Sequence, residues 1–130
     1  MIVIVFFSLM IFVIGIYSAM IISTNSLIRD VESVFRLEVD RSVTEGRPID
    51  QYNYNNHAEA RGREVGGISY SLRRRFVWHN FQYGYIWARY TRVVYDIDGR
   101  ILTGASRIPT RWRIERQNGR WEIVEIFERP

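Results

Sequence analysis

The first 22 residues constrain the fold of this chain more than any other feature. They read MIVIVFFSLMIFVIGIYSAMII, and the first charged side chain is Arg29. An uncharged apolar stretch of this length matches the roughly 20 residues that an α-helix needs to cross the hydrocarbon core of a bilayer. A helix that is apolar on all sides is stable in lipid or deep inside a large protein, and 130 residues are too few for the second. We therefore predict a cell-membrane protein with a single transmembrane helix over residues 1–23 and one small domain over residues 24–130.

A cleaved signal peptide is the main alternative for this segment. Such a peptide has a basic region, a shorter apolar core and an A-x-A-like cleavage site. Here no basic residue precedes the apolar run, and Ser18-Ala19-Met20 fits such a site poorly. The positive-inside rule, applied to Arg29, Arg36 and Arg41, puts the domain in the cytoplasm. Acidic residues are mixed among these few arginines, so the rule decides the orientation only weakly.

The composition narrows the chemistry that is available. All 18 basic residues are arginine, the net charge is +4, and there is no cysteine. Neither a disulfide nor a thiolate metal site is therefore possible. Arginine forms bidentate pairs with carboxylates and phosphates and stacks on aromatic rings. Because 14 acidic residues are interspersed, most of the arginines are expected at ordinary solvated positions, as in any arginine-biased composition.

A second helix is predicted after the apolar segment. The polar residues 23–26 are either a short break or the continuing rim of the same helix. After them, apolar residues recur at three- and four-residue spacing, which is typical of an amphipathic helix from about residue 27 to residue 43; they are Leu27, Ile28, Val31, Val34, Phe35 and Val39. Glu45-Gly46-Arg47-Pro48 should end this helix. A short helix is predicted over residues 58–65.

Two turn pairs, Asp98-Gly99 and Asn118-Gly119, indicate tight hairpins between β-rich segments. They predict strands at about residues 72–81, 85–97, 100–117 and 120–128. The chain is therefore expected to have an α+β fold, in which the amphipathic helix packs on a bent antiparallel sheet of about four strands.

Two-residue turns fix a register, which places Tyr95 opposite Leu102, Trp87 opposite Thr110, and Ile114 opposite Ile123. The face expected to form the core then carries Tyr85, Trp87, Val93, Tyr95, Leu102, Ile108, Trp112, Ile114, Trp121, Ile123 and Phe127. The other face carries Tyr90, Arg92, Arg107, Arg111, Arg113, Glu115, Glu122, Val124 and Ile126.

Two positions conflict with this regular register. Glu115 falls opposite Glu122, and like charges in opposed positions are unfavourable. Pro109 falls in a middle strand, where it cannot donate a ladder hydrogen bond. A bulge between Gly104 and Pro109 would explain the proline and would shift the register on one side of it.

The C-terminal hairpin carries a family resemblance. The segment Asn118-Gly119-Arg120-Trp121-Glu122-Ile123-Val124 resembles the closing G-[K/R]-W-x-[I/V] strand of the NTF2-like (cystatin-like cone) superfamily, and residues 85–100 are similar to its strand that runs into an Asp-Gly turn. The resemblance covers about half of the chain. It implies a cone-shaped α+β domain. Several bacterial members of the superfamily carry one transmembrane helix, face outward and act as assembly subunits of secretion or conjugation machinery. None of the catalytic positions known in the superfamily matches a residue here.

The sequence contains no recognisable catalytic or metal-binding pattern. His57 and His79 are the only histidines, too few for a metal site. Asp96-Ile97-Asp98-Gly99 has its glycine too early for a calcium loop. No serine lies in a nucleophile elbow. We therefore expect no enzyme activity, no cofactor and no metal.

The leading hypothesis is a membrane-anchored module that binds protein partners, such as a subunit of an envelope or secretion complex facing out of the cytoplasm. The predicted binding face consists of Tyr90, Arg92, Arg107, Arg111 and Arg113, and a predicted pocket is lined by Tyr85, Trp87 and Trp112. One alternative is a pilin-like or pseudopilin-like structural subunit, and another is a small-molecule-binding or enzymatic NTF2-like domain. A homo-oligomer is compatible with these hypotheses. Nucleic-acid binding is disfavoured, because acidic residues neighbour the arginines.

Overall fold

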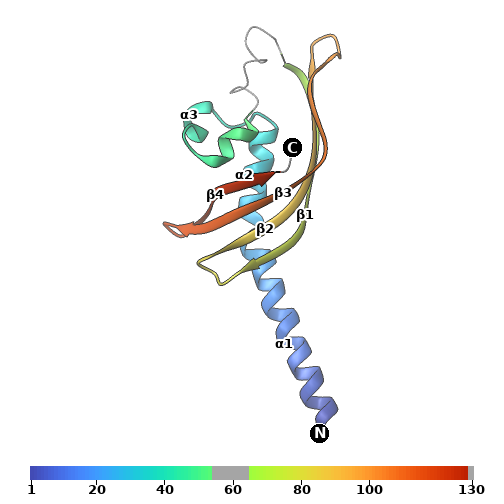
Figure 1. Cartoon of the computed structure of the whole chain (residues 1–130), viewed down its shortest axis with the longest axis vertical. Coiled ribbons are helices and arrows are strands. Elements are labelled where there is room, and N and C mark those ends of the chain that lie inside the picture. The colour runs from blue at the N-terminus through green and yellow to red at the C-terminus, as the bar shows by residue number, and fades with distance from the viewer. Residues whose placement is uncertain (54–64, 129–130) are drawn as a thin grey trace.

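A computed structural model describes residues 1–53 and 65–128 of the chain (Figure 1). An α+β fold is observed, as predicted. Its elements are helices α1 (Ile2–Ser23), α2 (Asn25–Phe35) and α3 (Arg41–Thr44), the 3₁₀ helix η1 (Pro48–Tyr52), and strands β1 (Val65–His79), β2 (Tyr83–Asp96), β3 (Ile101–Gln117) and β4 (Arg120–Glu128). Apart from Val65, which lies in β1, the helix predicted over residues 58–65 is outside the described residues.

Helix α1 projects away from the rest of the protein (Figure 1). Met20 is its only buried residue, and residues 2–16 are all exposed. The helix is long and apolar enough to cross a membrane, and a signal sequence near an N-terminus has the same properties. The polar break that follows is a single residue, Thr24, whose hydroxyl donates to the carbonyl oxygen of Ile21 (3.0 Å). Helix α2 begins directly after it and runs almost in line with α1.

Helix α2 ends at Phe35, so the prediction that the amphipathic helix reaches residue 43 is wrong. The N–H of Leu37 donates to the carbonyl of Val34, and the N–H of Glu38 donates to that of Ser33. These two bonds form a Schellman motif, which requires a left-handed residue directly after the helix cap. Leu37 supplies it with a φ of 59°. Glycine is the usual residue there, and its absence hid this helix end in the sequence.

The four strands form one antiparallel sheet in the order β1-β2-β3-β4, and it curves around α2 (Figure 1). Both predicted hairpins are confirmed. Asn118 and Gly119 have φ values of 52° and 76°, as a type I′ turn requires. The turn at Asp98-Gly99 is one residue longer than predicted, because the N–H of Asp96 donates to the carbonyl of Arg100 (2.8 Å), and Tyr95 therefore pairs with Ile101 and not with Leu102. Strand β1 begins seven residues earlier than the predicted residue 72, at Val65.

The core fills the space between α2 and the concave face of the sheet. The buried residues of α2 are Leu27, Val31, Val34 and Phe35. Their partners on the sheet and η1 are also buried; they are Ile49, Tyr52, Val77, Ile86, Ala88, Tyr90, Trp112, Ile114, Trp121 and Ile123. We call the face of the sheet that is turned toward α2 the inner face and the opposite one the outer face.

The predicted faces are correct for β3 beyond Arg107 and wrong for β2. Leu102, predicted in the core, precedes the bulge and lies on the outer face, because the buried Val94 pairs with Thr103. Trp112 and Ile114 are buried as predicted, but the inner residues of β2 are the even-numbered ones from Ile86 to Val94. The cause is a bulge at Arg107, which lies in the segment where a bulge was expected and has a φ of 53°. One extra residue on β3 moves Trp87 from opposite Thr110 to opposite Arg111. Since side chains alternate along a strand, this slip turns Trp87 to the outer face.

A second register shift lies between Arg113 and Ile114. Ile114 pairs with Ile123 as predicted, but beyond the shift Phe127 pairs with Arg111 and joins the outer face. Glu115 does lie opposite Glu122. Each of these two carboxylates has an arginine partner, because Arg113 pairs with Glu115 and Arg47 with Glu122.

Candidate functional site: an arginine-lined groove on the outer face

The structure does not bring the predicted binding residues together on one face. Tyr90 and Arg92 are buried on the inner face, whereas Arg107 is exposed. Arg111 and Arg113 are half-buried on the outer face. The predicted face therefore mixed residues from the two sides of the sheet, because the register was one residue out of phase.

The predicted pocket is likewise divided between the two faces. Tyr85 and Trp87 are half-buried on the outer face, and Trp112 is fully buried on the inner face. The ring centroids of Tyr85 and Trp87 lie 5.8 Å apart. These two residues contact each other as predicted, but Trp112 belongs to the core.

The polar groups of the inner face are bound to one another around Tyr52. The Tyr52 hydroxyl accepts a hydrogen bond from Trp112 Nε1 (2.9 Å), contacts Thr110 Oγ1 (3.0 Å) and donates to Glu128 (2.9 Å). Burial raises the pKa of Tyr52 well above its usual value. Tyr90 also donates to Glu128 (3.2 Å), and burial raises its pKa too. These bonds satisfy the buried polar atoms of Tyr52, Thr110 and Trp112 and stabilise the packing of η1 on the sheet.

Arg92 has a structural role in the same region. Its guanidinium donates to the carbonyl oxygen of Tyr52 and lies over the ring of Phe35, 5.2 Å from the centroid. Burial lowers the pKa of Arg92. The group is engaged with its neighbours and is not available on the surface for a ligand.

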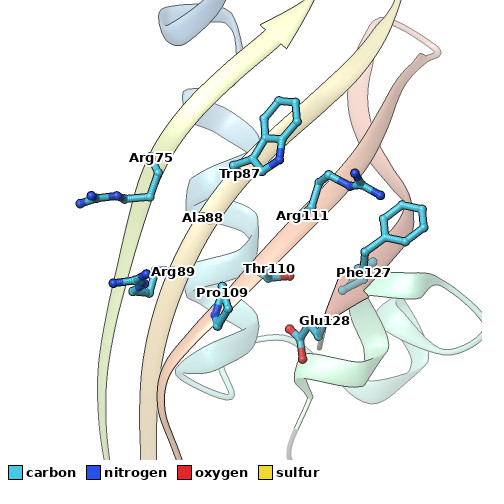
Figure 2. A pocket seen from close by; sticks show the side chains of 10 residues that line it. Arg75, Trp87, Ala88, Arg89, Pro109, Thr110, Arg111, Phe127 and Glu128 are labelled. Carbon is cyan, nitrogen blue, oxygen red and sulfur yellow. The ribbon is translucent and has the colours of Figure 1, made fainter. Parts of the chain in front are cut away.

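The outer face carries a groove with a volume of about 760 Å³ that crosses all four strands (Figure 2). Its walls are Arg75 from β1, Trp87 and Arg89 from β2, Pro109 and Arg111 from β3, and Phe127 from β4. A smaller depression of about 320 Å³ adjoins it, shares Arg75 and Arg89, and adds Arg73 and Arg107. We call Arg73, Arg75, Arg89, Arg107 and Arg111 the arginine patch.

The arginine patch has an uncompensated positive charge. Within the described residues, none of its five members forms an ion pair. Arg73 and Arg89 lie directly opposite each other on β1 and β2, where like charges are unfavourable. Arg113 differs from them, because it pairs with Glu115 and Glu125 (3.2 Å each). The charge is thus concentrated on β1, β2 and the middle of β3.

Arg111 links the aromatic and the basic parts of the groove. Its guanidinium lies 4.4 Å from the ring centroid of Phe127 and 5.4 Å from that of Tyr85 (Figure 2 shows Phe127). Its Nε is buried and has no hydrogen-bond partner among the residues that the structure describes. Stacking on two rings holds the planar guanidinium in place, which leaves its donor fork for a carboxylate or phosphate.

The groove contains little that could transfer a proton or hold a metal. Its one carboxylate, Glu128, is engaged by Tyr52 and Tyr90. Among the described residues there is no group of three or more metal-ligating side chains. His79 is buried against the end of α1, where its Nε2 lies 3.0 Å from the carbonyl oxygen of Met20. The arrangement is suited to binding an anionic group.

Sequence reasoning missed Arg73, Arg75 and Arg89 as members of this site. The signal was the run Arg73-Arg74-Arg75, the only three consecutive arginines in the chain. A regular strand would point Arg73 and Arg75 to one face and Arg74 to the other. Arg74 indeed turns inward and donates to the carbonyl oxygen of Ile21 (3.0 Å). Comparison of the chain with protein-family models, with curated proteins and with solved structures finds no match.

Proposed function

We propose that this protein is a membrane-tethered, NTF2-like binding module that docks an acidic segment of a partner protein in the outer groove. The observation that carries the proposal is the arginine patch: five arginines that have no carboxylate partner among the described residues gather around a groove with aromatic walls. A carboxylate-bearing segment would relieve the repulsion between Arg73 and Arg89. Apolar residues of the same segment would pack on Trp87 and Phe127. Such surfaces, with arginine and aromatic anchors, are typical of protein interfaces.

The membrane tether is supported by the way in which α1 joins the domain. Met20 is buried in the core, and the carbonyl of Ile21 accepts a hydrogen bond from Arg74. The ring of Tyr17 stacks on that of Phe76, with centroids 5.8 Å apart. Cleavage near Ala19 would remove the Tyr17 contact and cut the chain beside a buried core residue. This packing favours an uncleaved anchor over a signal peptide.

The NTF2-like assignment is supported by topology. The sheet curves around α2, and the strand that begins at Arg120 closes it beside β3. The interior of this cone is occupied by Trp112, Tyr52 and Phe35, each less than 2 % exposed. A binding role on the outer face therefore fits the packing better than a small-molecule cavity inside the cone.

A pilin-like structural subunit is the second candidate. The nearly continuous α1 and α2, followed by an antiparallel sheet, favour it. Such a subunit would be processed at its N-terminus and would assemble through α1. An intact N-terminus in mass spectrometry of the native protein would contradict this candidate.

Photocrosslinking in native membranes tests the binding module. A benzophenone amino acid at Ser71, which lines the smaller depression, reports on what occupies the patch without removing an arginine. We expect an adduct with a specific protein that has an acidic segment at the crosslinked site. The double variant Arg75→Glu/Arg89→Glu should lose the adduct. Arg75 and Arg89 line both the groove and the smaller depression, and the variant reverses the charge of each.

Arg100→Glu is the matched control, since Arg100 is exposed in the turn between β2 and β3, away from the patch. This variant should keep the adduct. A yield from the Arg75→Glu/Arg89→Glu variant equal to that from wild type would overturn the proposed docking site. Protease treatment of intact cells shows the orientation: cleavage of the domain is expected for an outward-facing module, and full protection would place it in the cytoplasm.

A further inference from the structure

The tip of the β1–β2 hairpin exposes large aromatic side chains. Residues 76–88 contain no Asp, Glu, Lys or Arg, and Arg75 and Arg89 flank them on either side. Trp78 is 59 % exposed, Tyr83 63 % and Phe81 37 %. Clustered exposed aromatic residues of this kind usually mark a contact surface.

This tip is fixed beside the end of α1. His79 Nε2 lies 3.0 Å from both the carbonyl oxygen of Met20 and the hydroxyl of Ser23. His79 Nδ1 accepts a hydrogen bond from the N–H of Phe81 (3.0 Å), so Nε2 carries the proton and donates to α1. Figure 1 shows the β1–β2 turn at the lower end of the sheet, alongside the upper, C-terminal part of α1. The tip and the last turn of α1 therefore lie at one level.

The apolar surface of α1 extends to that same level. Ile22 is 67 % exposed, and the first polar residues of the chain beyond it are Ser23 and Thr24. If α1 spans a bilayer, the hydrocarbon must reach Ile22 to cover it. The rise from Ile2 to Ile22 is about 30 Å, at about 1.5 Å per residue, which matches the thickness of a bilayer core. The hairpin tip then lies at the boundary between lipid and water.

From this geometry we propose that the β1–β2 hairpin tip inserts Trp78, Phe81 and Tyr83 into the interfacial layer of the bilayer that α1 crosses. Tryptophan and tyrosine favour this layer because an apolar ring and a polar group are both satisfied there. The contact gives the domain a second attachment to the membrane and fixes its orientation. The proposal rests on the membrane anchor of the proposed function, but it does not depend on the partner.

The insertion also explains the position of the arginine patch. Arg75 lies three residues from Trp78 along β1, a rise of about 10 Å. The headgroup layer on each side of the core is about 5–8 Å thick. The patch would therefore be held just outside the headgroups, where a soluble or membrane-bound partner reaches it.

The absence of cysteine from the sequence permits a direct test by single-cysteine labelling. The full chain is reconstituted in phosphatidylcholine vesicles with a fluorescent label on Gln82→Cys, in the turn of the hairpin, or on Asp98→Cys, in the turn at the other end of β2. Lipids with a nitroxide near the headgroup should quench the label at position 82 by about threefold or more relative to that at position 98. A label on Ser8→Cys, within α1, should be quenched by lipids with a nitroxide deep in the acyl chain.

Replacing Trp78 and Tyr83 with serine should remove the quenching at position 82 and leave that at position 8 unchanged. If the label at position 82 is quenched no more than the label at position 98 while position 8 is quenched, the inserted tip is refuted and the anchor stands. If position 8 is not quenched, the anchor fails and the insertion fails with it. Unchanged far-UV circular dichroism of the serine variant confirms that the loss of quenching is not a loss of fold.

Discussion

Replacing Arg89 with glutamate should stabilise the domain while abolishing partner binding. Arg89 lies directly opposite Arg73 and shares the groove with Arg75 and Arg111. No carboxylate among the described residues pairs with any of these four arginines. The wild-type chain therefore keeps a repulsive cluster that folding does not require.

The size of the effect follows from the cross-strand geometry. Opposed side chains of opposite charge on an antiparallel pair contribute roughly 0.2–1 kcal/mol, and like charges are unfavourable by a similar amount. Arg89→Glu removes one repulsive pair and creates one attractive pair with Arg73, a net gain of about 1 kcal/mol. For a domain of about 100 residues this gain raises Tm by about 4–8 °C.

Thermal unfolding of the full chain in detergent, followed by circular dichroism, measures the effect. The gain should be largest at low ionic strength and should shrink in about 1 M salt, where the Debye length falls to about 3 Å. Arg100→Glu changes the net charge equally but places the new carboxylate beside Asp96 and not opposite an arginine, so it should not raise Tm.

A Tm for Arg89→Glu equal to or below that of Arg100→Glu at low salt would refute the reasoning. It would mean that the two opposed guanidinium groups avoid each other in solution at no energetic cost. A gain that persists in high salt would point to strand propensity or packing, and would also contradict an electrostatic origin.

Two further predictions concern the core and its pH dependence. Trp112→Ala should lower the free energy of unfolding by about 3–5 kcal/mol, because the indole is fully buried, whereas Trp87→Ala on the outer face should cost much less; equal losses in urea titrations would contradict the observed register. Burial lowers the pKa of His79 below its ordinary value of 6.5, so the unfolded chain binds a proton more readily than the folded one. Stability should be retained above about pH 6.5 and decrease as the pH falls below it through the folded pKa. His79→Gln should remove this part of the decrease in urea titrations at several pH values, and an identical profile for the variant and wild type would show that His79 does not titrate with unfolding.

The sequence alone determined the elements whose signals are local. The apolar run predicted α1, the spacing of Leu27, Val31 and Val34 predicted the buried face of α2, and the two turn pairs predicted the hairpins. These features depend on residues a few positions apart, so propensity and periodicity are sufficient to find them. The end of α2 was not predicted, because a leucine occupies the left-handed position that glycine usually marks.

The outer groove was decided by the tertiary structure. A bulge of one residue at Arg107 turned Trp87 and Arg89 outward, and a second shift brought Phe127 to the same face. Pro109 indicated that a bulge was present in this part of the sequence, but it did not indicate that Arg107 would be the extra residue of β3. Since every side chain beyond a bulge changes face, one misplaced residue redistributes a whole strand between core and surface. The burial of Trp112 against Tyr52 and α2 selects the register, and that contact spans 60 residues of sequence.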